Sequence, residues 1–138
     1  MTVRPRVILI ALALQVSPSL LPAAHTQGWV EEACGYQEFH MTNVVGLPVG
    51  QELVLRVRDT PFPLAVRTMV ASWWQARGQR CSSDGKCEDA TQAEIWLNET
   101  KGRIKKVSGR YSVDFADQHL EGQFVVKYRD MKPPPRCE

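Results

Sequence analysis

The stretch "VSGRYSVDFADQHLEGQFVVKYR" (residues 107–129) indicates the fold class more clearly than any other part of the chain. Apolar and polar residues alternate on both sides of the short segment ADQH, as in two half-buried strands joined by a turn. We expect Phe115 to pair with Leu120. In that register Tyr111 lies opposite Phe124, and the apolar side chains of both strands share one face. The stretch therefore predicts an antiparallel hairpin with one face in the core.

The same period of two recurs elsewhere in the chain. In QELVLRVRD (residues 51–59) Leu53, Leu55 and Val57 occupy alternate positions, and ATQAEIWLNE (residues 90–99) has a similar pattern. Short alternating strands separated by turn residues are typical of two packed antiparallel sheets. The sequence therefore predicts an all-β fold, an antiparallel β-sandwich of about seven strands.

Residues 62–77 fit two different structures. Val66, Met69, Val70 and Trp73 have the spacing of a helical stripe, with a proline near its start and a glycine just beyond it. The same segment also contains an alternating apolar row that fits a strand. We prefer the strand, because a turn and a second alternating segment follow directly in the sequence. The alternative is an α+β fold with one helix near residues 63–77.

Residues 1–26 have the order of a secretory signal peptide. Arg4 and Arg6 precede an apolar run over residues 7–16, and small residues follow it. The run is shorter than the roughly 20 residues that a membrane-spanning helix needs. We therefore expect a single β domain over residues 27–138, secreted or periplasmic and without a membrane span.

The chain contains four cysteines. In an oxidising compartment an even number predicts disulfides, here two. Of the possible connectivities we favour Cys81 with Cys87 and Cys34 with Cys137. The first disulfide closes the short SSDGK turn, and the second ties the two ends of the domain together. The spacing of Cys81 and Cys87 is not that of zinc ligands, and we expect no metal and no cofactor.

The register around that turn requires an irregularity. If the two cysteines lie directly opposite each other in regular strands, the apolar rows of the strands fall on opposite faces of the sheet. One extra residue in the first strand, at Gly78, would restore the match. Trp74 then pairs with Ile95 in the core. Trp73 pairs with Trp96 on the opposite face.

This outward tryptophan pair is the candidate binding face. Trp73 and Trp96, flanked by Arg67 and Arg77, could form a platform for a sugar ring, a cation or a side chain of a partner. Asn98 opens the glycosylation sequon NET, and an attached glycan would require this row to be exposed. The alternative is that other parts of the protein cover both rings, which then serve stability alone.

The sequence gives little support for catalysis or for nucleic-acid binding. It lacks the G-x-S-x-G, H-E-x-x-H, Walker and G-x-G-x-x-G motifs. We expect His40 and His119 to be ordinary surface histidines, because a general base also needs a nucleophile and an orienting group. Beyond the predicted signal peptide basic and acidic residues balance, which argues against a nucleic-acid partner.

Gly109, Tyr111, Phe115, Gly122 and Phe124 give the last hairpin the pattern S-G-x-[YF] followed by x-G-x-F. In this pattern residues 94–129 resemble small, uncharacterised exported bacterial β-sandwich proteins. The resemblance implies an exported β domain and carries no activity with it.

Together these observations favour a non-enzymatic binding or structural module. We expect it to recognise a protein or a glycan through the face that carries Trp73 and Trp96. Two other classes of function stay open. One is a small barrel that carries an apolar ligand, and the other is a hydrolase that uses His40 or His119 together with a carboxylate.

Overall fold

The computed structural model describes residues 26–33, 35–58, 70–100 and 105–129. Within these ranges the chain is all β and contains no helix. The strands, in chain order, are β1 (Gln27–Ala33), β2 (Tyr36–Thr42), β3 (Glu52–Arg58), β4 (Ser72–Cys81), β5 (Cys87–Asp89), β6 (Gln92–Leu97), β7 (Lys106–Asp114) and β8 (His119–Tyr128). No helix in the described part of the chain has the length and apolar character needed to cross a membrane.

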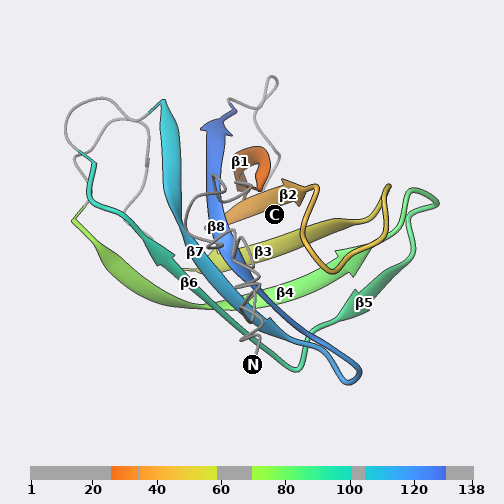
Figure 1. The fold of residues 1–138 in the computed structure, drawn as a ribbon. Coiled ribbons are helices and arrows are strands. Elements are labelled where there is room, and N and C mark those ends of the chain that lie inside the picture. The colour runs from red at the N-terminus through yellow and green to blue at the C-terminus, as the bar shows by residue number, and fades with distance from the viewer. Residues whose placement is uncertain (1–25, 34, 59–69, 101–104, 130–138) are drawn as a thin grey trace, which may run out of the picture.

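The strands form one sheet that closes on itself (Figure 1). Their order is β3-β2-β1-β8-β7-β6-β4-β5, and β3 also pairs with β4. All neighbours are antiparallel except β1 and β8, which are parallel. The predicted sandwich is therefore wrong: the fold is a seven-strand β-barrel, with β5 as a short addition beside β4.

The sequence pattern does not distinguish a sandwich from a barrel, because both folds bury the same alternating apolar residues. Alternation specifies which face of a strand is covered, whereas the barrel is defined by two long-range contacts between strands. One is the antiparallel ladder from Glu52↔Cys81 to Arg56↔Arg77, which joins β3 to β4. The other is the parallel contact of β1 with β8. Residues 72–77 belong to β4, not to a helix, and residues 63–69 lie outside the described ranges.

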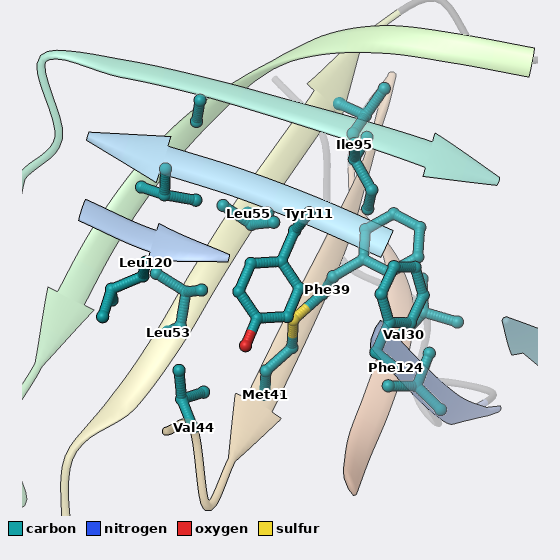
Figure 2. Packing of buried hydrophobic residues seen from close by; sticks show 14 of the residues in the cluster. Val30, Phe39, Met41, Val44, Leu53, Leu55, Ile95, Tyr111, Leu120 and Phe124 are labelled. Carbon is teal, nitrogen blue, oxygen red and sulfur yellow. The ribbon is translucent and has the colours of Figure 1, made fainter. Parts of the chain in front are cut away.

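Inward-facing side chains fill the barrel. The rings of Phe39 and Phe124 meet edge to face with centroids 5.8 Å apart, and the Tyr111 ring lies 6.5 Å from that of Phe124. Figure 2 shows these rings projecting from different strands toward one interior. The buried apolar side chains of the barrel include Val30, Phe39, Met41, Leu53, Leu55, Val57, Ile95, Val107, Tyr111, Val113, Leu120, Phe124 and Val126.

The hairpin of β7 and β8 is confirmed, but its register differs by two residues from the predicted one. Val113, not Phe115, lies opposite Leu120. Phe115 belongs to the turn, where its N–H donates to the carbonyl of Gln118 at 2.8 Å. A shift of two residues leaves every side chain on the same face, so alternation alone does not distinguish the two registers.

In the observed register the two large rings of the hairpin lie opposite glycines. Tyr111 pairs with Gly122, and Phe124 pairs with Gly109. A Cβ on Gly122 would lie 2.8 Å from the Tyr111 hydroxyl oxygen. A Cβ on Gly109 would lie 3.1 Å from the Phe124 ring and only 1.9 Å from the carbonyl oxygen of Trp96. The glycines therefore give the rings room to lie across the neighbouring strand.

Where β4 meets β5 and β6, the irregularity lies on the strand opposite the predicted one. Arg77 and Gly78 face the three residues 90–92, so the extra residue lies between β5 and β6 and not in β4. The N–H of Ala90 donates to the carbonyl of Gly78 at 2.9 Å. A Cβ on Gly78 would lie 3.1 Å from the Cβ atoms of both Ala90 and Ala93. Gly78 thus provides space for the irregular strand to approach.

One disulfide, between Cys81 and Cys87, is present in the described part of the chain, with Cα atoms 4.1 Å apart. The two-disulfide prediction is corrected accordingly, and Cys34 and Cys137 lie outside the described residues. Within the closed turn, the Asp84 carboxylate accepts hydrogen bonds from the Ser82 hydroxyl and from the N–H of Lys86. Both bonds lower the pKa of the Asp84 carboxyl group, and the bond from Ser82 has the larger effect.

Candidate functional site

The candidate site lies on the outer surface of β4, β6 and β7. Trp73 pairs with Trp96, and Trp96 in turn pairs with Arg110. The three side chains form a row across the strands, which we call the tryptophan platform. Trp73 is 52% exposed, the most exposed aromatic residue in the described part of the chain.

The register of β4 assigns its two adjacent tryptophans to opposite faces. Trp74 pairs with Ile95, as predicted, and packs partly buried against the core. Its indole N–H donates to the hydroxyl of Ser72 at 2.8 Å, which satisfies the one polar atom of the ring. Because side chains alternate along a strand, the neighbouring Trp73 must project outward.

Arg110 covers the ring of Trp96. Its guanidinium carbon lies 4.2 Å from the ring centroid, well inside the range of a cation–π contact. Arg110 itself is exposed, whereas Trp96 is half-buried beneath it. The platform therefore offers one open indole face at Trp73 and a charged group held over the second ring.

The sequence predicted different arginines at this place. Arg67 lies outside the described residues, and Arg77 lies four residues along β4 from Trp73, about 13 Å away at the usual strand rise. Arg110 was missed, although the pattern of β6 and β7 contains the signal. Placing Leu97 and Gly109 opposite each other on the inner face brings Trp96 and Arg110 together on the outer face.

Two shallow hollows flank Arg110 on the barrel surface. One has a volume of about 440 Å³ and is lined in part by Ser112, Glu121 and Gln123. The other measures about 310 Å³ and is lined in part by Asn98, Ser108 and Gln123. Hydroxyl, amide and carboxylate groups therefore lie beside Arg110, and those of the first hollow also lie beside Trp96, so that a ligand can combine ring contacts with hydrogen bonds.

The predicted glycosylation site borders the second hollow. Asn98 is exposed, and its side-chain amide donates to the hydroxyl of Ser108 at 3.0 Å. A glycan attached to Asn98 would project from the surface beside the tryptophan platform. The exposure that modification requires is present at Asn98.

His40 has an orienting carboxylate, but its Nε2 atom is shielded from solvent. Its Nδ1 lies 3.1 Å from Glu52 Oε1, and its ring stacks on that of Trp29 with centroids 4.8 Å apart. Nε2 lies 2.7 Å from Glu38 Oε1, but outside the direction of a hydrogen bond. Because this nitrogen is shielded from solvent, it cannot take a proton from a substrate without a rearrangement.

His119 lies on the surface beside the turn of the last hairpin. Hydrogen bonds with the carboxylates of Asp114 and, more weakly, Glu121 raise its pKa. Both partners are acidic, so the arrangement favours an imidazolium held between two carboxylates. A general base requires the neutral ring, which this environment disfavours.

No model of a protein family, no curated protein and no solved structure matches this chain. Within the part of the chain that the structure describes, no three His, Cys, Asp or Glu side chains are arranged to hold a metal ion. The chemistry available at the platform is that of its indole rings, its guanidinium group and the polar groups around them.

Proposed function

We propose that this protein is a non-enzymatic binding module that holds a saccharide against the tryptophan platform. The observation that carries the proposal is the exposure of Trp73 within a regular ladder of paired strands. Trp73 and Trp96 lie directly opposite each other in a regular ladder, so the backbone positions from which both rings project are fixed before a ligand arrives. A platform that is already ordered loses little conformational entropy when it binds.

The composition of the platform favours a saccharide over other ligands. A sugar ring has an apolar face of C–H groups and a rim of hydroxyls. The indole of Trp73 matches the apolar face of one sugar ring. Ser112, Glu121 and Gln123 line the first hollow, beyond Trp96 on the sheet, and they match the hydroxyl rim of a further ring of the same oligosaccharide. The guanidinium of Arg110 lies over the ring of Trp96, and its N–H groups can donate hydrogen bonds to sugar hydroxyls.

We further propose that the protein acts outside the cytoplasm. The predicted signal peptide over residues 1–26 and the resemblance of residues 94–129 to exported β proteins both support this location. The disulfide between Cys81 and Cys87 is compatible with it, because such bonds persist mainly in oxidising compartments.

The two alternative functions have less support. A barrel of about eight strands has an interior just wide enough for its own side chains, and this barrel has seven. Rings such as those of Phe39, Phe124 and Tyr111 occupy that interior, where a carrier would hold an apolar ligand. A hydrolase would need an accessible base, and His40 Nε2 is shielded from solvent.

The test is a screen of the purified protein against free oligosaccharides, followed by affinity measurements on the variants Trp73→Ala and Val49→Ala. Val49 is a fully exposed apolar residue in the β2–β3 loop and serves as the control. We expect W73A to lose binding while its free energy of unfolding changes by no more than about 0.5 kcal/mol. V49A should bind as the parent does. Unchanged affinity of W73A, or capture of proteins but of no saccharide, would overturn the proposal.

A further inference from the structure

The ladder that closes the barrel opens at one end. β3 and β4 pair only as far as Arg56↔Arg77. Beyond this point β3 continues to Arg58 while pairing with β2, and β4 pairs with β6 alone. The two strands diverge, and between them lies a hollow of about 280 Å³. We call it the seam pocket; its lining residues are Tyr36, Arg56, Arg58, Gln75, Ala76 and Arg77.

Three of the six described residues that line the seam pocket are arginines. Arg56 and Arg77 lie directly opposite each other on the outer face. Like charges in this position destabilise an antiparallel pair, so the arrangement works against closure of the barrel. The Nε–H of Arg56 donates to Glu38 at 3.0 Å, which compensates one of the charges.

The other two arginines have no such compensation in the described structure. Neither Arg58 nor Arg77 forms an ion pair with a carboxylate of the described residues. Glu94, which is opposite Gln75 on β6, accepts instead a hydrogen bond from Gln92. The seam pocket therefore carries an excess of positive charge that no carboxylate of the described residues compensates.

The remaining polar groups of the pocket are also donors. The guanidinium of Arg56 lies 5.4 Å from the centroid of the Tyr36 ring, which helps to fix its orientation. The Tyr36 hydroxyl and the Gln75 amide add further N–H and O–H groups. Guanidinium groups match the oxygens of phosphate and sulfate in geometry as well as in charge. We propose that the seam pocket binds a tetrahedral oxyanion, phosphate or sulfate, either free or as a substituent of a small ligand.

This proposal does not rest on saccharide binding at the platform. Arg77 and Trp73 are four residues apart on β4, about 13 Å at the usual strand rise, so a variant of one need not alter the other. An anion in the pocket would also relieve the repulsion between Arg56 and Arg77 and thereby strengthen the closing ladder. Binding and barrel stability are therefore coupled at this position.

The experiment titrates the purified protein with inorganic phosphate, with sulfate and with glycerol 3-phosphate, which has no sugar ring, at an ionic strength held constant with sodium chloride. Binding is followed by NMR shifts of the arginine side chains and by the melting temperature. We expect saturable shifts at Arg56, Arg58 and Arg77 and a melting temperature that rises with each anion. Tighter binding of glycerol 3-phosphate than of phosphate would indicate a substituent of a larger ligand, and equal binding would indicate the free ion.

Two variants make the test specific. Arg77→Gln should raise the dissociation constant for phosphate at least tenfold, since it removes a charged donor. In chloride alone R77Q should melt at a higher temperature than the parent, because the opposed charges are gone. Lys127→Gln, at an exposed position on the outer face of β8, should bind phosphate as the parent does. The proposal is overturned if phosphate and sulfate have no effect beyond that of chloride, or if K127Q weakens binding as much as R77Q.

Discussion

The β7–β8 hairpin and the β3–β4 seam are both antiparallel ladders of the same barrel, yet they differ in almost every physical respect. The hairpin has nine residue pairs joined by a short turn, whereas the seam has five pairs between strands separated by residues 59–71. Rings in the hairpin lie opposite glycines that accommodate them, whereas Arg56 in the seam lies opposite Arg77. We infer that stability is concentrated in the hairpin and that the seam gives up stability for a charged pocket.

The largest effect is expected from the substitution Gly109→Ala, which should destabilise the β7–β8 hairpin. The new Cβ would lie 1.9 Å from the carbonyl oxygen of Trp96, a backbone atom of β6 that cannot move alone. We expect a loss of about 4 kcal/mol or more in the free energy of unfolding, measured in urea. Gly122→Ala is the control, because its Cβ meets only the end of the Tyr111 side chain and should cost about 1–3 kcal/mol. Equal losses would contradict the observed register.

The substitution Phe124→Ala tests the packing of the ring itself. Phe124 is 1% exposed and contacts the rings of Phe39 and Tyr111, so its removal leaves a cavity in the barrel. The expected loss is about 3–5 kcal/mol in the same urea titration. Lys127→Ala, on the outer face of β8, should cost under about 0.5 kcal/mol. If both variants unfold at the same urea concentration, the inward row of β8 is assigned wrongly.

The two adjacent tryptophans of β4, one of the strands of the seam, should differ in their contribution to the free energy of unfolding. Trp74 is partly buried against the core, and Trp74→Ala should lower the free energy of unfolding by about 2–3 kcal/mol, less than for a fully buried ring. Trp73→Ala should change it by no more than about 0.5 kcal/mol. Thermal or urea unfolding monitored by circular dichroism would separate the two. A similar loss in both variants would mean that Trp73 serves the core and that no open platform exists.

The smallest effect is expected from pH, at the turn of the hairpin. The pKa of His119 is raised above its ordinary value of 6.5 by its hydrogen bonds to Asp114 and Glu121. A group whose pKa is higher in the folded state stabilises that state while it is protonated. The contribution of His119 to the stability of the folded state is therefore complete below about pH 6.5, and it is lost as the pH rises through the raised pKa of this group. His119→Gln should remove this part of the pH dependence of the melting temperature, and an unchanged profile would rule the contribution out.

The sequence was sufficient for the local pairings of the fold. The all-β class, the Cys81–Cys87 disulfide and the pairing of Trp73 with Trp96 follow from alternation and from residues close in sequence. The closure of the barrel does not, because β1–β8 joins the first strand to the last, and β3 and β4 are connected by residues 59–71 without a disulfide-closed turn that would fix their register. The hairpin register was missed for a different reason: the Tyr111 ring prefers a glycine opposite it, whereas our prediction placed it opposite another ring.

The candidate site was predictable only in part. Trp73 and Trp96 were found because their pairing depends on one hairpin. To predict that Arg110 lies beside Trp96, one needs the register of β6 with β7. Gly109 indicates this register, because only a glycine allows the close approach to the Trp96 backbone. The seam pocket could not be predicted, because Arg56 and Arg58 of β3 lie next to Arg77 only in the observed register of β3 with β4. The alternation of each strand does not specify which residues of the two strands pair.

The parallel contact between β1 and β8 has a consequence for how the chain is made. Val30 of β1 pairs with Tyr128 of β8. This edge of β1 therefore stays exposed until β8 has been synthesised. While the ribosome is still producing β4 to β7, the sheet of β1, β2 and β3 has an exposed edge on each side. Such edges invite pairing with other chains, and ladders between distant segments form slowly. We therefore expect the newly made chain to depend on chaperones, or on being kept unfolded, until its final strand has emerged.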